Sequence, residues 1–377
     1  MARVGLVVNP IAGMGGRVGL HGTDGDLIHE AIRRGATPQA AQRATQALIA
    51  IKSAMRQSIE LVVPEGELGL RSANDAAFTA TVIHRAGDGP TNAATTRQAV
   101  EQFRDMGVDL IMFAGGDGTA RDVVSVVGDR IPVLGIPTGV KMRSAVFARG
   151  PVQAGDVAAA FLNGRTKTQA AEVVDVVSTG SWDQQIFGIC QVPVGESRMQ
   201  AMKGGPVAGS TAVLSRLQRH LADNFQADHL YLLGPGITTA GIAAHLGLQT
   251  SRIGVDAVLN GQLVGSDLSE SQIDSLLGVH SSATCILGVV GGQGFLLGRG
   301  NQQLSGNVLK RIGAKNLVIV ASKEKVTSLQ PAKLWIDLDD DSVAEELVGY
   351  RRVLVGVDEE VVMELVSTAR RRTNVAS

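Results

Sequence analysis

Apolar runs alternate with helix-like patterns through the first 150 residues. Residues 38–52 and 92–107 have the amphipathic spacing of helices, and Gly107 is placed to end the second one. A further helix is expected to begin near Thr119. Between and around these helices, five runs have the pattern of buried strands: 3–8 (RVGLVV), 59–63, 80–84, 108–114 and 131–137. This alternation predicts a mostly parallel, three-layer α/β domain over residues 1–150.

After residue 151 the pattern becomes β-rich, which predicts a second domain over residues 151–344. Residues 212–225 and 269–278 are expected to supply helices. The final apolar pattern, within 345–377, is expected to pack back on the first domain and complete it. The strand-like runs of the second domain are 171–177, 185–195, 229–234, 251–265, 283–292, 316–322 and 333–338.

Composition narrows the range of functions. The chain has 377 residues, of which 44% are hydrophobic and 19% charged, enough for two sizeable cores. A formal net charge of −1 and only 3% aromatic residues argue against nucleic acid or an anionic membrane as a partner. Cys190 and Cys285 lie too far apart in sequence to suggest a disulfide framework or a metal knuckle, so a cytoplasmic location is expected.

Glycine is over-represented, with 46 residues, and it gathers after strand-like runs. Three such loops follow strands of the first domain: Asn9-Pro10 onward, GGDGT (115–119) and GIPTGVKMR (135–143). Loops that follow parallel strands meet at one edge of a sheet, where ligands bind. Glycines let backbone N–H groups approach phosphate oxygens, and the helix start at Thr119 favours an anion. The sequence therefore predicts a phosphate site at this edge.

Two common phosphate motifs are missing from the sequence. In GMGGRV (13–18) Val18 stands where the dinucleotide-binding motif needs its third glycine, and the P-loop pattern does not occur. The acid inside GGDGT needs another explanation, since phosphate would repel it. We interpret Asp117 as a catalytic residue that takes a proton from an attacking hydroxyl, or as a residue linked to Mg²⁺. The alternative is a plain helix cap in a glycine-rich turn.

Further polar residues are candidates for the same site, each with a simpler explanation beside it. Asp24 is a turn residue or a second carboxylate of the site. Lys141 and Arg143 neutralise phosphate, or they are a solvated pair at a helix start. Thr238 and Thr239 contact a nucleotide or begin a helix. The last candidates are in the loop GRGNQQ (298–303), which either faces a ligand or is only exposed to solvent. They are Arg299, Asn301 and Gln302.

With these motifs in place, the sequence resembles the ATP-NAD kinase-like family of the NAD kinase, diacylglycerol kinase and phosphofructokinase-like superfamily. It is most similar to the branch associated with acetoin catabolism. The resemblance runs from the first strand to GYRRVLVG (349–356). Five blocks carry it in order: VNPIAGMGGRVGLHGTDG, FAGGDGTARD, GIPTGVKM, LGPGITT and GGQGFLLGRGNQQLS.

The resemblance implies an α/β first domain, a β-sandwich-like second domain, and transfer of the ATP γ-phosphoryl group to a hydroxyl. Asp117 matches the aspartate beside the acceptor hydroxyl. Gly115, Gly116, Gly118 and Thr119 match the phosphate-contacting turn, with Asn9 nearby. Mg²⁺ is expected on the nucleotide phosphates, with Asp117 as a candidate ligand. Characterised NAD kinases carry an Asn-Glu or Asn-Asp pair downstream of GGDGT that holds NAD, and no Asn-Glu dipeptide occurs in this chain; GPGITTAG (234–241) only loosely matches their second-domain turn.

The function predicted from these observations is an ATP-dependent kinase, with NAD(H) as the favoured acceptor and NADP(H) as product. Two alternatives stay open: the same chemistry on a lipid or a small polyol, and a non-catalytic nucleotide-binding module associated with acetoin catabolism. ATP and polyphosphate are both candidate donors. A homo-oligomer, dimer or tetramer, is also expected.

Overall fold

The computed structural model describes residues 1–20, 22, 27–84, 91–140, 142–176, 184–195, 198–200 and 211–369. These residues divide into two compact units. The first unit comprises 1–14, 22–32 and 37–202, and the second comprises 15–21, 33–36 and 203–377. Among the described residues, no helix is both long and apolar enough to cross a membrane.

The first unit is built on a five-stranded parallel sheet in the order β3-β2-β1-β4-β5. The chain moves from β1 to one side of the sheet and then from β4 to the other, so β1 and β4 flank the point where the order reverses. The strands are β1 (Arg3–Val8), β2 (Glu60–Pro64), β3 (Ala80–Ile83), β4 (Leu110–Gly115) and β5 (Val133–Pro137).

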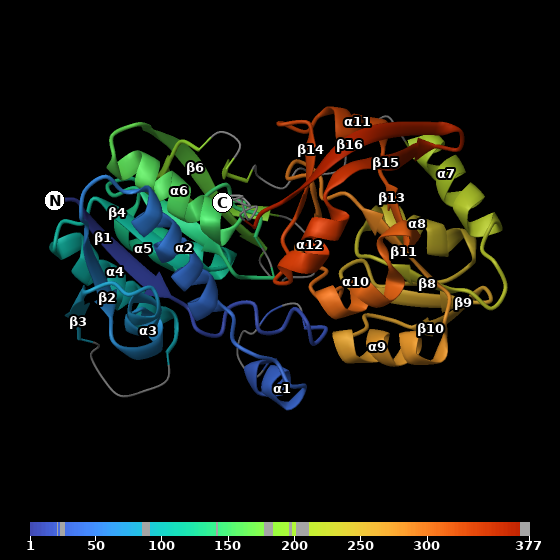
Figure 1. Cartoon of the computed structure of the whole chain (residues 1–377), viewed down its shortest axis with the longest axis horizontal. Helices are drawn as coiled ribbons and strands as arrows, with labels where there is room; N and C mark the ends of the chain where they lie inside the picture. Colours follow the sequence, from blue (N-terminus) through green and yellow to red (C-terminus); the bar gives the residue numbers. More distant parts are fainter. Residues whose placement is uncertain are drawn as a thin grey trace, which may run out of the picture. The chain divides into compact units, whose positions relative to one another are not determined.

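Helices cover this sheet, and the interior strand β4 is buried along its whole length, as expected for a parallel strand between helical layers (Figure 1). Asn92 caps α4 in a capping box with Thr95, and Gly107 follows that helix at φ 65°. The helices here are α1 (Leu27–Arg33), α2 (Ala40–Ala54), α3 (Leu70–Asp75), α4 (Ala93–Asp105), α5 (Asp117–Val127) and α6 (Pro151–Leu162), with a short 3₁₀ helix at Gly66–Leu68.

The first unit extends further along the chain than the sequence pattern indicates. Helix α6 packs against α2, and a Cβ atom on Gly155 would lie 2.3 Å from the carbonyl oxygen of Ala47. The glycine therefore permits a contact that ties the start of the predicted second domain to the first unit. The antiparallel pair β6 (Thr168–Val176) and β7 (Gln184–Pro193) also packs against α5 in this unit.

The second unit contains a nine-stranded mixed sheet in the order β10-β9-β8-β11-β13-β15-β16-β14-β12. Its strands are β8 (Leu230–Leu233), β9 (Asp256–Leu259), β10 (Gln262–Gly265), β11 (Ala283–Gly288), β12 (Phe295–Leu297), β13 (Leu317–Val320), β14 (Lys333–Ile336), β15 (Gly349–Gly356) and β16 (Glu359–Ser367). Helices accompany them: α7 (Thr211–Asp223), α8 (Ile237–His245), α9 (Glu270–Val279), α10 (Gly306–Ile312), α11 (Lys323–Thr327) and α12 (Asp341–Leu347), with a 3₁₀ helix at Ala314–Asn316.

The fold class is confirmed as a parallel α/β unit followed by a unit with a larger sheet. The closing segment differs from the expectation that 345–377 completes the first domain. β15 pairs with β13 and β16 pairs with β14, so both closing strands are hydrogen-bonded into the sheet of the second unit. A short early segment also belongs to the second unit, where the carbonyl oxygen of Arg17 accepts a hydrogen bond from the amide of Glu270.

Candidate phosphate-binding site

The GGDGT turn joins the end of β4 to the start of α5. Gly116 is the N-cap residue of α5, in extended backbone conformation, and it provides no side chain to cap the helix. The first N–H groups of a helix have no partner within the helix, and the helix dipole makes this end favourable for an anion. An uncapped start at the reversal point of the sheet is therefore suited to phosphate.

The glycines of this turn have different surroundings. A Cβ on Gly115 would lie 2.4 Å from the side chain of Thr119, so the fold itself requires glycine there. A Cβ on Gly118 would meet nothing within 4 Å. Gly118 is thus free of any packing demand within the first unit, which leaves room for a ligand to approach its backbone.

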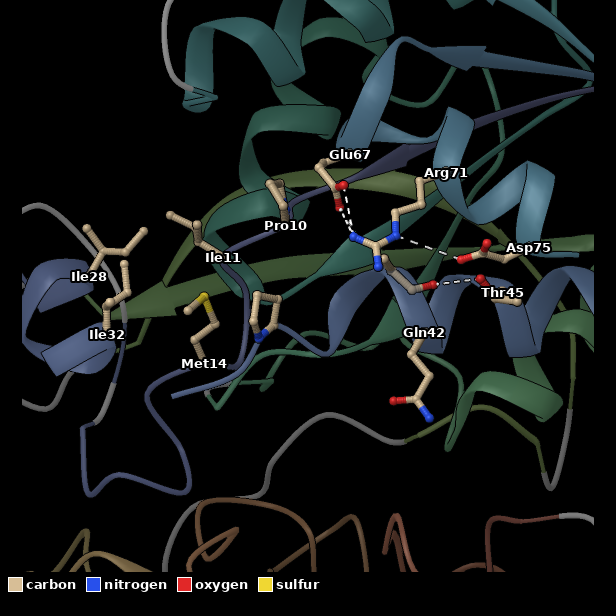
Figure 2. A pocket seen from close by; sticks show the side chains of 12 residues that line it. Pro10, Ile11, Met14, Ile28, Ile32, Gln42, Thr45, Glu67, Arg71 and Asp75 are labelled. Carbon is tan, nitrogen blue, oxygen red and sulfur yellow. Dashed lines mark hydrogen bonds and ion pairs between the residues drawn. The ribbon is translucent and has the colours of Figure 1, made fainter. Parts of the chain in front are cut away.

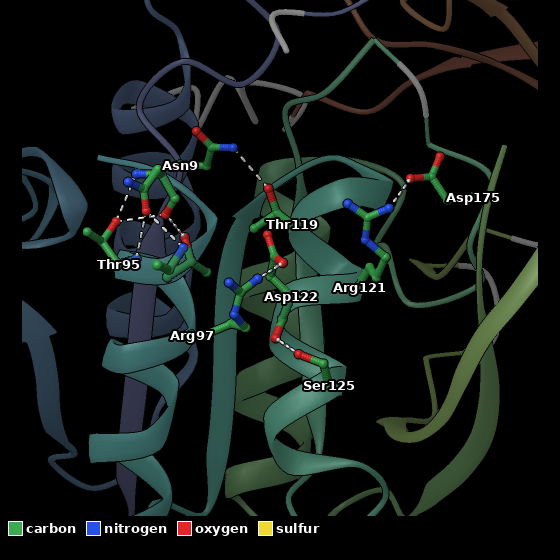
Figure 3. Close-up of polar contacts among 11 residues, drawn as sticks. Asn9, Thr95, Arg97, Thr119, Arg121, Asp122, Ser125 and Asp175 are labelled. Carbon is green, nitrogen blue, oxygen red and sulfur yellow. Dashed lines mark hydrogen bonds and ion pairs between the residues drawn. The ribbon is translucent and has the colours of Figure 1, made fainter. Parts of the chain in front are cut away.

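Asn9 connects the first loop to this turn. Its backbone N–H donates to the carbonyl oxygen of Ala114 at 2.9 Å, and its side-chain Nδ2 donates to Oγ1 of Thr119 at 3.1 Å. Figure 3 shows Asn9 directed toward Thr119 at the start of α5. Two residues 110 positions apart are therefore joined at the ends of β1 and β4, as the sequence predicts for this edge.

The loop after β5 completes the arrangement. The amides of Thr138 and Gly139 both donate to the carbonyl oxygen of Gly115, at 3.2 and 3.1 Å. Gly13 lies against this loop at φ 79°, and a Cβ there would fall 1.9 Å from the carbonyl oxygen of Thr138. All three glycine-rich loops thus meet within the first unit.

The carboxylate of Asp117 is buried, with 2% of the residue exposed, and it is held by the loop after β5. Oδ1 accepts hydrogen bonds from the amides of Arg143 and Ser144, both at 3.0 Å, and from the Ser144 hydroxyl at 2.7 Å. Among the described residues, Oδ2 accepts a hydrogen bond from the Arg143 amide alone, at 2.8 Å. Burial raises the pKa of Asp117 above its ordinary value, and the bonds from Ser144 and Arg143 oppose that rise.

Ser144 and Gln200 also support this loop, and neither stands out in the sequence as a functional residue. The Ser144 hydroxyl bonds to Asp117 and lies 3.1 Å from the amide of Val174 on β6. The Gln200 amide donates to the carbonyl oxygens of Met142 and Ser144, at 3.3 and 3.1 Å. Both side chains are buried, so the backbone on either side of Arg143 is fixed from two directions. In the sequence, Ser144 is a serine next to the predicted cation Arg143, and this pattern is too common to indicate a functional residue.

Two buried polar atoms near the turn have no hydrogen-bond partner among the described residues. They are Oγ1 of Thr138 and Nη1 of Arg143. Thr138 is only 7% exposed, and a buried hydroxyl or guanidinium N–H without a partner is costly. Both belong to the loop that holds Asp117, and phosphate oxygens would satisfy both.

Helix α5 carries two ion pairs beyond the turn. Arg97 of α4 lies 2.8 Å from Asp122, and Arg121 lies 3.6 Å from Asp175 of β6 (Figure 3). Asp175 also contributes to the raised pKa of Asp117, because a nearby negative charge disfavours a second one. Asp175 is thus a further acidic residue of this region that the sequence pattern did not point to.

The remaining sequence candidates lie outside the described residues or belong to the second unit. Asp24 and Lys141 lie outside the described residues. Thr238 and Thr239 are in the first turn of α8 in the second unit, where the Thr239 hydroxyl bonds to the carbonyl oxygen of Gly236 at 3.0 Å. Their nucleotide contact stays a prediction, as does the role of the GRGNQQ residues.

Those GRGNQQ residues make local contacts in the second unit. Arg299 pairs with Asp337 at 2.6 Å, and the exposed fractions of the two side chains are 5% and 6%. Asn301 accepts from the amide of Gly298 and donates to the carbonyl oxygen of Leu296. Gln302 donates weakly to the carbonyl oxygen of Gly298, at 3.4 Å. Arg299 and Asn301 therefore stabilise this turn.

A metal ion would need acidic or other donor side chains as ligands. Among the residues that the structure describes, no group of three or more His, Cys, Asp or Glu side chains could hold an ion. Oδ1 of Asp117 already accepts three hydrogen bonds, whereas Oδ2 accepts one. Asp117 therefore fits at most a single contact to a magnesium ion whose other ligands are phosphate oxygens and waters.

Comparison with known proteins identifies the family. The model of the ATP-NAD kinase N-terminal domain matches residues 4–166, and the model of the ATP-NAD kinase C-terminal domain matches residues 226–365. No curated protein sequence matches the chain.

The similar solved structures are remote. Two are of "a putative diacylglycerol kinase from Bacillus anthracis str. Sterne", each 17% identical, with TM-scores of 0.25 and 0.26. Each comparison covers 45% of this chain, and it spans only 42% and 44% of those chains. A third, glycinamide ribonucleotide transformylase 1 from Symbiobacterium toebii, is 19% identical with a TM-score of 0.21, covering 52% of this chain and 74% of its own. Scores this low carry no argument about activity.

Proposed function

The chain belongs to the ATP-NAD kinase family, a family of phosphotransferases, and we propose that it transfers the γ-phosphoryl group of ATP to the 2′-hydroxyl of NAD(H). The observation that carries the proposal is the meeting of three loops around Asp117 at the uncapped start of α5. Both family models support NAD(H) as the acceptor, since one matches each part of the chain. Membership of the acetoin-associated branch stays a prediction.

Phosphate binding is assigned to the start of α5 and the loop after β5. The amides of Gly118 and Thr119 and the hydroxyl of Thr138 would donate hydrogen bonds to phosphate oxygens. The guanidinium of Arg143 would add positive charge next to them. Mg²⁺, when bound on the phosphates, would supply further charge neutralisation.

Proton transfer is assigned to Asp117. Oδ2 accepts a single hydrogen bond and so keeps room to accept the proton of the acceptor hydroxyl. The hydroxyl oxygen then forms the new bond to the γ-phosphorus while the bond to the β-γ bridging oxygen breaks, and ADP leaves. The raised pKa of Asp117 makes it a stronger base than an ordinary carboxylate, which favours this transfer near neutral pH.

The test is product analysis by mass spectrometry. The purified protein is incubated with Mg²⁺ and either ATP or polyphosphate, and with NAD, NADH, a short-chain diacylglycerol or a polyol in turn. We expect ATP with NAD or NADH to give the phosphorylated dinucleotide, and Asp117→Asn to lower turnover by about two orders of magnitude or more. A phosphorylated lipid or polyol without NADP would overturn the choice of acceptor. The expected homo-oligomer and cytoplasmic location stay predictions that this experiment does not address.

A further inference from the structure

Gln200 lies beside the loop after β5, and its backbone is fixed there without help from its side chain. The amide of Gln200 donates to the carbonyl oxygen of Phe147 at 3.0 Å. Phe147 forms a parallel bridge with Gly135 of β5, and Met199 forms an antiparallel bridge with Ala148. The residue is 2% exposed. Main-chain contacts therefore place Gln200 within the first unit, next to β5.

The orientation of the Gln200 side-chain amide follows from two neighbouring carbonyl groups. Its nitrogen Nε2 lies 3.3 Å from the carbonyl oxygen of Met142 and 3.1 Å from that of Ser144. Carbonyl oxygens accept hydrogen bonds and do not donate them, so the NH₂ group must face both. The amide oxygen Oε1 is left buried, and it has no hydrogen-bond partner among the described residues. An unpartnered buried acceptor costs about 1–3 kcal/mol, which a ligand with a hydrogen-bond donor would recover.

Oε1 of Gln200 differs from the two unpartnered atoms that are assigned to phosphate. The Thr138 hydroxyl and Nη1 of Arg143 can both donate hydrogen bonds, which suits the acceptor oxygens of a phosphate group. Oε1 can only accept a hydrogen bond. Ionised phosphate oxygens cannot satisfy it, because they carry no hydrogen. The donor for Oε1 must therefore belong to another part of the bound ligands.

A cavity of about 620 Å³ in the first unit does not provide the place for that donor. Figure 2 shows the residues that line it, among them isoleucines of α1 and the charged side chains at and before α3. All of them lie between Pro10 and Asp75 in the sequence, and none comes from the loop after β5 or from residues 198–200. A ligand group confined to this cavity would not meet Gln200, so the partner of Oε1 has to lie near Asp117.

Gln200 and Asp117 hold the same short segment, residues 142–144. Gln200 donates to the carbonyl oxygens at both ends of the segment. Asp117 accepts hydrogen bonds from the amides of Arg143 and Ser144. The attacking hydroxyl has one hydrogen, and Asp117 takes it in the proposed reaction. A hydroxyl on the adjacent carbon of the same molecule would bring a second hydrogen to Oε1.

We propose that Gln200 determines specificity for the acceptor by accepting a hydrogen bond from a second hydroxyl, next to the one that is phosphorylated. This rests on the proposed function, because Asp117 must face the reacting hydroxyl. The acceptor is then a vicinal diol, such as the ribose of a dinucleotide or a small polyol. A diacylglycerol has a single free hydroxyl and leaves Oε1 without a partner. A site built around a hydrogen bond to a substrate hydroxyl strongly rejects molecules that lack it.

The first test compares two ligands on the unmodified full-length protein and needs no turnover. Calorimetry measures the affinity for NAD and for an NAD analogue whose adenosine ribose lacks the 3′-hydroxyl. We expect the analogue to bind at least about tenfold more weakly. Equal affinities would overturn the inference, because Oε1 would then be satisfied without the second hydroxyl, for example by an ordered water.

The second test removes the side-chain amide. Gln200→Met keeps the length of the side chain without its oxygen. Gln153→Met is the matched control, because Oε1 of Gln153 on α6 is also buried without a partner among the described residues. In Gln200→Met we expect the two affinities to agree within about twofold, whereas Gln153→Met should keep the ratio of the unmodified protein. A merely structural role of Gln200 would weaken both ligands equally and leave the ratio unchanged, which would contradict the assignment.

These outcomes are separable from those of the proposed function. The expected affinity ratio without phosphoryl transfer would refute only the catalytic proposal. Phosphorylation of NAD by a protein that binds NAD and the 3′-deoxy analogue equally would refute only the role of Gln200. Binding of a short-chain diacylglycerol in place of NAD would overturn both. If Gln200→Met does not fold, the comparison of ligands on the unmodified protein still decides.

Discussion

Replacing Ser144 by alanine removes one hydroxyl that bonds to the candidate catalytic carboxylate. Ser144 has 0% exposure, and its hydroxyl lies 2.7 Å from Oδ1 of Asp117 and 3.1 Å from the amide of Val174. A hydrogen bond to a charged group contributes about 1.5–3 kcal/mol, and leaving a buried N–H without its partner adds to the loss. We expect Ser144→Ala to lower the free energy of unfolding by about 2–4 kcal/mol at neutral pH.

The free energy of unfolding lost in Ser144→Ala should depend on pH, and the pKa of Asp117 determines whether the loss grows or shrinks as the pH rises. Its pKa in the folded protein is raised, so its contribution to stability is present below the ordinary carboxyl pKa and is lost as the pH rises through the folded pKa. The Ser144 hydroxyl lowers the pKa of Asp117, and removing that hydroxyl should raise the pKa further. The destabilisation by Ser144→Ala should therefore grow as the pH rises.

The assay is urea unfolding between mildly acidic and mildly alkaline pH. Ser72→Ala is the matched control, because Ser72 is equally buried and donates to the neutral carbonyl oxygen of Ala41 at 3.1 Å. Its destabilisation should not vary with pH. In the background of Asp117→Asn, the pH dependence of Ser144→Ala should disappear. The reasoning is refuted if Ser144→Ala and Ser72→Ala respond to pH alike, or if the extra dependence survives without Asp117.

Three other substitutions test ligand binding or stability at single residues. Gly118→Ala should leave stability unchanged or raise it by up to about 1 kcal/mol, yet lower ATP affinity in calorimetry; equal affinity would place phosphate elsewhere. Asn9→Ala should raise the KM for ATP about fivefold or more in initial-rate assays through loss of its bond to Thr119, whereas an unchanged KM would make that bond structural only. Arg299→Met should lower the free energy of unfolding in urea by about 3–5 kcal/mol because it removes one partner of the buried Arg299–Asp337 ion pair, and a loss under about 1 kcal/mol would contradict a large contribution from that pair.

Much of the first unit could be predicted because its signals are local. The run at 3–8 becomes β1 with the same bounds, and the helix ended by Gly107 follows from capping and backbone preferences. The meeting of the three glycine-rich loops follows from parallel topology alone, since each loop comes after a strand of the same sheet. Hydrophobic period and turn chemistry carry this information within a few residues of each element.

The parts that could not be predicted depend on contacts between distant residues. The positions of the closing strands are set by pairing with β13 and β14, and a strand-like pattern does not specify its partner. Ser144 and Gln200 contact Asp117 and the loop only once β5 and the segment near 200 have been placed. Arg299 lies in a loop whose polar composition is typical of ligand binding. Its ion pair with buried Asp337 forms because Asp337 follows the neighbouring strand β14.

The GGDGT motif shows that glycine can occur at neighbouring positions for two different physical reasons. At Gly115 a side chain would collide with Thr119, so glycine is required for β4 to run into α5 even if no ligand ever binds. At Gly118 a side chain would project into open space, and alanine would be the better helix former. A protein selected for stability alone would therefore gain by replacing Gly118 and lose by replacing Gly115. Packing does not explain glycine at position 118, which agrees with the proposed approach of a phosphate to the backbone of the first turn of α5.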